Sequence, residues 1–314
     1  MAGLPDGLRE RLRLPLIAAP MFRVSGPDLV AAACRSGVIG SFPAANCRTT
    51  EELDEWLTRL DGELTPDDAP YCPNLIVRHA ALDEHLDCLR RHRVEIVITS
   101  VGSPAPVVDA LGGSGILVLA DVASIRHARR AIDAGVDGLI LLTAGAGGQT
   151  GWANGFGFAR GVRRFYDGPI ALAGGIADGH ALFAATALGC DLAYMGTRFI
   201  ATAESMAAPA YKEMLTTSEL DDVLLTSAIT GLPTSMLRPS LMAAGLDPDA
   251  LPSELTRERS TELYGSGAGG PTRWRDLWSA GHSVSAVGDV PTVAELVERT
   301  ASEFAEARDR ACGT

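Results

Sequence analysis

The chain has almost no lysine: of its 27 basic residues only Lys212 is a lysine, and every other one is an arginine. Schiff-base chemistry and phosphate binding by a P-loop lysine are therefore excluded everywhere except at that residue. Aromatic residues are also scarce, at 5% of 314 residues, whereas alanine, glycine and aliphatic residues dominate. This length and composition suit one large α/β core, so length alone does not require two domains.

Other absences restrict the function further. The six cysteines are scattered and include no C-x-x-C pair, which excludes the usual zinc spacings and argues against a disulfide framework. We expect most of them to be buried thiols in a reducing compartment. No apolar run approaches the roughly 18 residues that cross a membrane, and the prolines in the short N-terminal run predict a strand, not a signal peptide. The net charge of −12 argues against nucleic-acid binding, so we expect a cytoplasmic protein that acts on a small molecule.

Eight short, unbroken apolar runs recur along the chain, and their starts lie 21 to 33 residues apart, which is the pitch of a βα unit. Unbroken runs are typical of parallel strands that are buried on both faces. Helical patterns separate the runs, and eight units favour a closed (βα)8 TIM barrel over an open doubly wound sheet. The predicted strands are Leu16–Met21, Val38–Ala44, Tyr71–Val77, Val94–Gly102, Gly115–Val122, Asp137–Gly145, Gly168–Ile176 and Leu192–Ile200.

The last helix, predicted at Val293–Ala307, is delayed by about ninety residues. We therefore divide the chain into a barrel, residues 1–200 and 290–314, and a mostly helical insertion at 201–289. Because the insertion follows a strand end, it lies on or beside the active-site face, where it caps the site, forms a homodimer contact, or does both. Within it, Trp274 and Trp278 are predicted to share one helical face, and Gly265–Gly270 to form a link or turn.

Two late strands end in small residues. Leu172–Ile176 reads Leu-Ala-Gly-Gly-Ile, and Tyr194–Phe199 reads Tyr-Met-Gly-Thr-Arg-Phe. Small residues there leave backbone N–H groups uncovered where a helix begins, so an anion can approach closely. The ends of strands 7 and 8 are where (βα)8 barrels frequently hold a phosphate. The sequence therefore predicts a ligand that carries a phosphate group.

The predicted mouth of the barrel carries few ionised groups: Asp121 ends strand 5, and Arg78 and His79 follow strand 3. The paired carboxylates of a glycosidase and the His/Asp cluster of a metal hydrolase are missing, so we expect no metal. Amides, hydroxyls, glycines and apolar groups instead suit a planar heteroaromatic cofactor that brings its own reactivity.

In combination these residues resemble the nitronate monooxygenase family of FMN-dependent TIM-barrel enzymes, from Leu16 to about Ser205. The resemblance implies a flavoprotein oxidoreductase with FMN as its cofactor. The segments that carry it are Ala19-Pro20-Met21, Val38-Ile39-Gly40-Ser41, Asn74-Leu75-Ile76-Val77, Ala146-Gly147-Gly148-x-x-Gly151, Ala173 to Gly179, and Gly196-Thr197-Arg198-Phe199.

The resemblance also implies a role for each matching position. Backbone groups of four residues would bind the FMN phosphate, helped by the dipole of the helix after Asp178; these four are Gly174, Gly175, Gly196 and Thr197. The flavin would contact residues at the ends of four strands. These are Ala19, Pro20 and Met21 of strand 1, Asn74 of strand 3, Thr99 or Ser100 of strand 4, and Gly147 and Gly148 after strand 6. From their positions after strand 1 and after the strand-6 loop, and not from the resemblance, we expect the substrate pocket to be walled by Phe22, Trp152 and Asn154, with simple packing as the alternative for Trp152.

One position departs from the family pattern. Its better-known members carry a histidine, taken as catalytic base or substrate contact, after the Gly-Gly pair, where this chain has Gln149. Glutamine cannot accept a proton in the useful pH range, so abstraction of a proton from a neutral nitroalkane would be impaired unless another base serves. A nitronate is already an anion, and its oxygens can accept hydrogen bonds from Gln149. This chain does have a histidine predicted near the mouth, His79, which is either catalytic or a surface residue at the start of a helix.

Three functions stay open. The first is a nitronate monooxygenase that oxidises alkyl nitronates with O2 to a carbonyl compound and nitrite. The second is an FMN-dependent NAD(P)H reductase of quinones or enoyl thioesters on the same barrel. The third is a flavin-free phosphate-sugar or nucleotide isomerase, or a binding barrel without chemistry, although the lack of a lysine or carboxylate pair at the strand ends weighs against the isomerase.

Overall fold

The computed structural model describes residues 3–253, 255–266 and 270–313. Eight parallel strands close into a barrel in the order β1-β2-β3-β4-β5-β6-β8-β9, so the predicted TIM barrel is confirmed. Each barrel strand falls within one predicted range. The strands are β1 (Leu16–Ala18), β2 (Ile39–Pro43), β3 (Tyr71–Ile76), β4 (Ile96–Ser100), β5 (Leu117–Val122), β6 (Gly138–Leu142), β8 (Ile170–Ala173) and β9 (Leu192–Met195).

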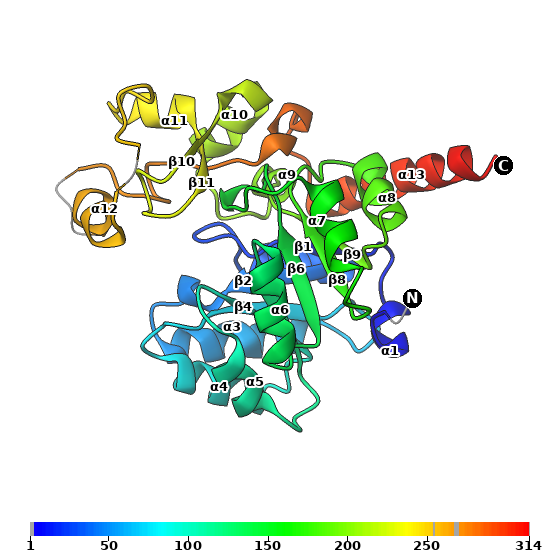
Figure 1. The fold of residues 1–314 in the computed structure, drawn as a ribbon. Coiled ribbons are helices and arrows are strands. Elements are labelled where there is room, and N and C mark those ends of the chain that lie inside the picture. The colour runs from blue at the N-terminus through cyan, green and yellow to red at the C-terminus, as the bar shows by residue number, and fades with distance from the viewer. Residues whose placement is uncertain (1–2, 254, 267–269, 314) are drawn as a thin grey trace.

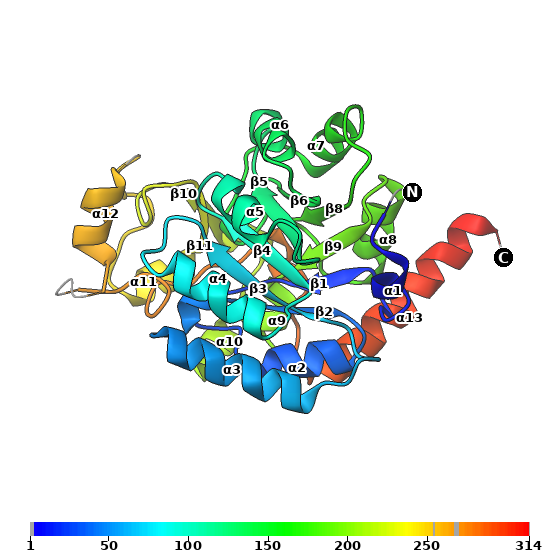
Figure 2. The ribbon, with the colours of Figure 1, turned by 90° about the horizontal axis from the view of Figure 1, so that it is seen from below.

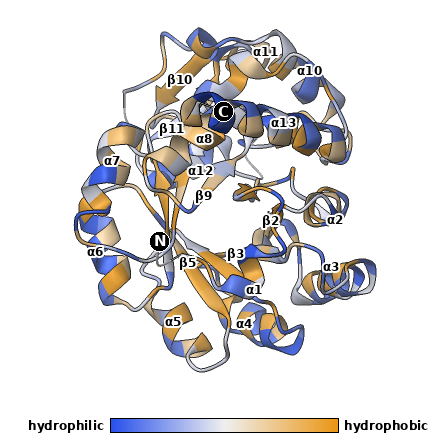
Figure 3. Ribbon diagram, turned by 90° about the vertical axis from the view of Figure 1, so that its right-hand side faces the viewer, coloured by the Kyte–Doolittle hydropathy of each residue, from blue (hydrophilic) through white to orange (hydrophobic). Residues whose placement is uncertain are grey.

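Helices surround these strands, as the view along the barrel in Figure 3 shows. They are α2 (Pro27–Arg35), α3 (Thr50–Glu63), α4 (Leu82–Arg91), α5 (Ala105–Leu111), α6 (Ile125–Asp133), α7 (Gly155–Val162), α8 (Gly179–Ala187) and α13 (Val293–Cys312). The short N-terminal helix α1 (Asp6–Arg9) instead packs Leu8 against the apolar residues that fill the barrel. Helix α13 begins at a capping box of Thr292 and Glu295 and packs against α8 and α2, which closes the ring of helices (Figure 2). Within the described ranges, no helix has both the length and the apolar character that crossing a bilayer requires.

The barrel has two apolar layers because its strands are buried on both faces. An inner layer fills the barrel with side chains such as Ile17, Ile39, Ile98 and Ile140. An outer layer lies between the strands and the surrounding helices and includes Leu75. Alternate residues of each strand feed the two layers, which explains why the strands read as unbroken apolar runs.

The eighth barrel strand is shorter than predicted. Strand β9 ends at Met195, and Thr197–Ile200 forms the single helical turn α9. The buried apolar residues Phe199 and Ile200 therefore belong to a helical turn and not to a strand. An apolar run this short does not distinguish the two states, so the prediction that Leu192–Ile200 is all strand is wrong after Met195.

The segment at 201–289 contains a small sheet that the sequence did not reveal (Figure 1). Strands β10 (Val223–Thr226) and β11 (Thr234–Leu237) are antiparallel, and β11 also pairs with β7 (Gly148–Gln149), which belongs to the loop after β6. The segment also contains helices, as its mostly helical character predicted. They are α10 (Pro209–Thr217), α11 (Arg238–Ala243) and α12 (Arg257–Tyr264), with 3-10 turns η2 (Leu220–Asp222) and η3 (His282–Ala286).

Trp274 and Trp278 do not share a helical face. Both lie in an irregular stretch in which Trp274 has a left-handed φ of 68° and its backbone N–H bonds to Leu277. That prediction is wrong because the tight turn replaces the expected helix. Part of the predicted Gly265–Gly270 turn, residues 267–269, lies outside the described residues.

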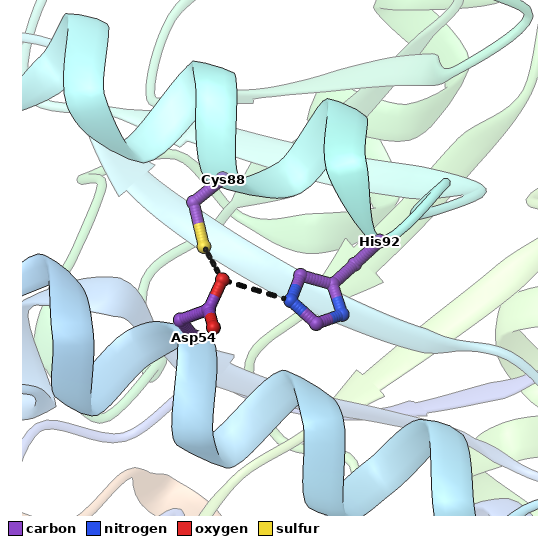
Figure 4. Close-up of side chains that lie close together, drawn as sticks. All are labelled: Asp54, Cys88 and His92. Carbon is purple, nitrogen blue, oxygen red and sulfur yellow. Dashed lines mark hydrogen bonds and ion pairs between the residues drawn. The ribbon is translucent and has the colours of Figure 1, made fainter.

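Five of the six cysteines are buried free thiols, as predicted, and Cys312 is exposed. Cys88 lies in a polar contact between α3 and α4, where Asp54 faces both Cys88 and His92 (Figure 4). Asp54 Oδ1 also accepts a hydrogen bond of 2.8 Å from Arg91, and these contacts hold the pKa of the Asp54 carboxyl down at about 2. The group therefore acts as an ion-pair network that joins the two helices outside the barrel.

Candidate active site

A cavity of about 660 Å³ opens at the carboxyl ends of the barrel strands. Most residues of its floor follow an inner-layer residue by two positions along the same strand. Asp121, for example, follows Leu119, and Leu142 follows Ile140. Because side chains alternate along a strand, these floor residues also face the barrel axis. This is the end of the barrel where TIM-barrel enzymes place their chemistry. The floor residues are Ala19, Asn74, Ser100, Asp121, Leu142, Ala173 and Tyr194.

Asn74 and Ser100 form a polar pair on this floor. The Ser100 hydroxyl donates to Asn74 Oδ1 over 3.3 Å, and Asn74 Nδ2 lies 3.5 Å from the Ile98 carbonyl. Both contacts are long, so the amide and the hydroxyl keep hydrogen-bonding capacity for a ligand in the cavity. The structure therefore brings together two of the predicted cofactor contacts.

Asp121 supplies a carboxyl group to the cavity floor. Its Oδ1 atom is buried and has no hydrogen-bond partner among the described residues. Burial raises the pKa of this carboxyl to about 7. Burial also raises the pKa of the Tyr194 phenol well above its ordinary value, and the charge of Asp121 adds to that effect. A carboxyl that changes charge near neutral pH and lacks a partner is a functional candidate.

The two predicted phosphate-binding segments both line the cavity with bare backbone. Gly174 and Gly175 have φ values of 115° and 75°, which favour glycine. A Cβ on Gly174 would lie 2.4 Å from Thr143 Oγ1, whereas a Cβ on Gly175 would project into open space. Gly174 and Gly175 follow strand β8, and Gly196 and Thr197 follow the neighbouring strand β9. A ligand can thus approach the main chain closely at two adjacent strand ends.

The helix after Asp178 does not contribute as predicted. The Asp178 side chain accepts a hydrogen bond of 2.8 Å from Ala181 N, and Glu303 of α13 accepts one of 2.9 Å from Gly179 N. Two carboxylates therefore already occupy the N-terminus of α8. The prediction that this helix dipole helps to bind phosphate is wrong, because α13 covers that helix end.

The glycine-rich loop after β6 packs tightly against the inserted segment. A Cβ on Gly147 would lie 2.9 Å from Gly281 N, and the His282 N–H bonds to the Gly145 carbonyl over 2.9 Å. The Thr197 hydroxyl accepts a further hydrogen bond of 2.9 Å from Gly281 N. Gly147 therefore allows two backbones to meet, and its neighbours Gly148 and Gln149 line the cavity.

Residues of the inserted segment form one wall of the cavity. The rings of Tyr211 and Trp278 stack with centroids 4.9 Å apart, and the Tyr211 hydroxyl donates to the Ser279 carbonyl. Arg273 and Trp274 also line this wall. The predicted boundaries at 201–289 and the dimer contact remain predictions.

Two predicted site residues on the strand side lie outside the cavity lining. His79 is exposed, stacks on His85 with ring centroids 5.0 Å apart, and accepts a hydrogen bond from Ala81 N. Thr99 points away from the barrel axis, because its neighbour Ser100 points inward, and its hydroxyl donates to the Leu119 carbonyl over 3.2 Å. Of the predicted pair, Ser100 is therefore the residue that reaches the cavity.

Two predicted substrate-pocket residues also lie elsewhere. The Trp152 side chain is 82% exposed, and Asn154 caps helix α7 by accepting from Phe156 N over 3.0 Å. Neither lines the cavity, because the chain turns away from the barrel mouth after Gln149 to begin α7. Phe22 does line it, together with Ala19, Pro20 and Met21.

Some cavity residues had no role in the sequence interpretation. Tyr194 could have been found, since it lies two residues beyond the inward-facing Leu192 in strand β9. Tyr211, Arg273 and Ser283 come from the inserted segment, and no local pattern indicated that they reach the barrel mouth.

With this geometry in place, comparison with known proteins identifies the family. The family model described as nitronate monooxygenase matches residues 74–303, and the chain belongs to that family. The expected resemblance is therefore confirmed. A probable nitronate monooxygenase of Staphylococcus saprophyticus is 27% identical over an alignment that covers 85% of this chain and 88% of that protein.

Other relatives carry different names. A (3aS,4S,5R,7aS)-5-hydroxy-7a-methyl-1-oxo-octahydro-1H-indene-4-carboxyl-CoA dehydrogenase of Rhodococcus jostii is 28% identical over 73% of this chain, but the match spans only 64% of that protein. Among solved structures, nitroalkane oxidase from Streptomyces ansochromogenes has a TM-score of 0.81 at 26% identity, covering 98% of this chain and all of that one. FabK from Thermotoga maritima also has a TM-score of 0.81 at 26% identity and covers 98% and 97% of the two chains.

Proposed function

We propose that this chain is an FMN-dependent oxidoreductase that oxidises alkyl nitronates with O2 to a carbonyl compound and nitrite. The observation that carries the proposal is the pair of bare main-chain segments, Gly174-Gly175 and Gly196-Thr197, at one end of a cavity with a polar floor. Family membership supports the same cofactor class.

The residues present fit FMN. The phosphate would bind to the main chain at Gly174, Gly175, Gly196 and Thr197, where the open space beside Gly175 leaves room for it. The flavin would lie against the segment Ala19-Pro20-Met21, with Asn74 and Ser100 as hydrogen-bonding groups. When bound, FMN supplies the redox chemistry, and the protein supplies binding and orientation.

Gln149 determines which substrate the site favours. Gln149 lines the cavity, and the pairing of β7 with β11 holds its backbone. Its side-chain amide can donate hydrogen bonds to the oxygens of a nitronate. It cannot take a proton from carbon, so a substrate that is already an anion suits this site better than a neutral nitroalkane. Asp121, with a pKa of about 7, is the group of the floor that can hold or release a proton near neutral pH.

A second candidate function is an FMN-dependent NAD(P)H reductase of quinones or enoyl thioesters. The name of the Rhodococcus relative, a carboxyl-CoA dehydrogenase, favours a thioester. The lack of a histidine base at Gln149 is compatible with this function, since hydride transfer needs no proton abstraction from a nitroalkane.

One experiment tests both candidates. The purified protein should be yellow with a flavin spectrum, and the cofactor should have the mass of FMN. Anaerobic mixing with a short alkyl nitronate should bleach the flavin, whereas mixing with NADH or NADPH should not. Bleaching by the pyridine nucleotide alone would favour the reductase, and a colourless protein that refuses added FMN would overturn both.

A further inference from the structure

A second, smaller cavity of about 100 Å³ adjoins the candidate active site. Gln149, Arg273 and Trp274 line both cavities, and Arg257 and Thr230 complete the smaller one. The two spaces therefore meet at three shared side chains. A ligand whose reactive end lies beside Gln149 can extend directly between the two arginines.

In the part of the chain that the structure describes, most other arginines pair with a carboxylate, and these two do not. Among the described residues, no carboxylate lies within ion-pair distance of Arg257 or Arg273. Arg273 instead donates to two hydroxyls of α12, Ser260 at 3.4 Å and Thr261 at 3.2 Å. Such contacts position a guanidinium without neutralising it.

The two positive charges also oppose each other. The pKa of Arg273 is lowered, first by partial burial and then by the charge of Arg257. Two neighbouring cations without an acid cost free energy unless an anion binds between them. A carboxylate would balance one charge, whereas a phosphate or diphosphate balances both and matches the donor geometry of two guanidinium groups.

We propose that Arg257 and Arg273 form a subsite for the phosphate or diphosphate group of an elongated cosubstrate whose reactive end lies beside Gln149. Coenzyme A thioesters and nicotinamide dinucleotides both carry this group. The inference rests on the second candidate function, the flavin-dependent reductase, because that function places the reactive end of such a cosubstrate in the larger cavity. It adds a recognition element that a short alkyl nitronate does not need.

Titration calorimetry on the FMN-loaded protein tests the subsite. The probes are inorganic pyrophosphate, NADPH and coenzyme A, each at two salt concentrations. Pyrophosphate and at least one of the nucleotides should bind, and the binding should weaken with salt. Which nucleotide binds identifies the source of the phosphate. If none of the three binds, the subsite does not exist.

Variants locate the binding. Arg273→Gln and Arg257→Gln should each raise the dissociation constant for pyrophosphate roughly ten- to hundred-fold, as expected for the loss of a charge-assisted hydrogen bond to phosphate. Arg259→Gln is the matched control, since Arg259 lies on helix α12 like Arg257 but pairs with Glu262. The dissociation constants of this control variant should stay within two-fold of those of the unmodified protein. Unchanged affinities in both test variants would overturn the inference. If Arg273→Gln does not fold, Arg257→Gln decides, because that side chain is exposed.

The two proposals fail separately. Loss of FMN from the unmodified protein contradicts the flavin function, while pyrophosphate binding that depends on Arg257 and Arg273 would still support the anion subsite. Conversely, a yellow protein that a nitronate bleaches, with pyrophosphate affinity insensitive to both substitutions, retains the function and removes the subsite.

Discussion

Gln149 lies opposite Thr234 in an antiparallel pairing that joins the loop after β6 to the inserted segment. The Thr150 N–H bonds to the Pro233 carbonyl over 3.1 Å and extends this connection. The Gln149 position is therefore held from outside the barrel, by a segment that follows the eighth strand. Substitutions in β11 should therefore change the position of Gln149 in the site through this pairing, although β11 itself does not line the cavity.

Gln149→His should create activity on neutral nitroalkanes. The imidazole can act as a general base where the amide cannot, and such a base contributes roughly 100-fold or more to proton abstraction. The measurement is the initial rate with nitroethane compared with ethyl nitronate. Gln149→Ala serves as the control and should gain no activity on nitroethane. If the unmodified protein already consumes nitroethane as fast as the nitronate, the role assigned to Gln149 is wrong.

Gly175→Ala should weaken FMN binding at least tenfold. Gly175 has a φ of 75°, and a Cβ there would enter open space beside the cavity, where the phosphate is proposed to bind. Gly245→Ala is a close control: its φ is 79° and a Cβ there also meets nothing within 4 Å, but it lies away from the cavity. Both substitutions should cost about 1 kcal/mol of stability from backbone strain. Fluorescence titration with FMN should separate them, and equal affinities would contradict the phosphate site.

Asp121→Asn should change how stability depends on pH. Burial raises the pKa of Asp121 to about 7 in the folded protein, whereas an unfolded aspartate titrates near 3.9. The unfolded chain therefore loses this proton first, so Asp121 lowers stability progressively from about pH 4 to pH 7, and the loss is complete above that range. The variant should gain melting temperature relative to the unmodified protein at about pH 8 but little at about pH 4.

Thermal unfolding at a fixed FMN concentration measures this difference. Asp67→Asn, at an exposed position, should show the same offset at both pH values. An Asp121→Asn offset that is equally independent of pH would show that the carboxyl is ionised in the folded protein throughout.

Asp191→Ala should destabilise the protein by about 3–5 kcal/mol, because it leaves a largely buried guanidinium without its carboxylate partner. Arg163 pairs with Asp191, and their side chains are only 14% and 6% exposed. Asp191 also accepts a hydrogen bond of 2.9 Å from Ile170 N at the start of β8. Denaturant unfolding measures the loss. Glu306→Ala, which breaks an exposed pair with Arg310, should change stability little.

The barrel was predictable because its signal is local. Each strand is buried on both faces and therefore appears as an apolar run, and the helices between them have caps such as Thr49 and Ser124. The backbone segments at Gly174 and Gly196 were also predictable, since only small residues leave the main chain open at a strand end. These features depend on neighbours within a few residues.

Residues chosen by proximity to a strand end were less reliable. Ser100 reaches the cavity and Thr99 does not, because adjacent side chains of a strand point to opposite faces. His79 and Trp152 lie only a few residues beyond strand ends, yet the chain has already turned toward the surface at both. The direction of a loop depends on what packs against it, and the linear pattern does not contain that information.

The sequence by itself determined the repeated βα units, the glycine positions at the seventh and eighth barrel strands, and the absence of a histidine at Gln149. Only the tertiary structure decided that Glu303 covers the start of α8, that Asp121 Oδ1 is buried without a hydrogen-bond partner among the described residues, and that Arg273 and Gln149 line the same cavity. The physical reason is the range of the interactions. Burial, backbone freedom and strand periodicity act between near neighbours, whereas these three relationships join segments that only the closed barrel and its inserted segment bring together.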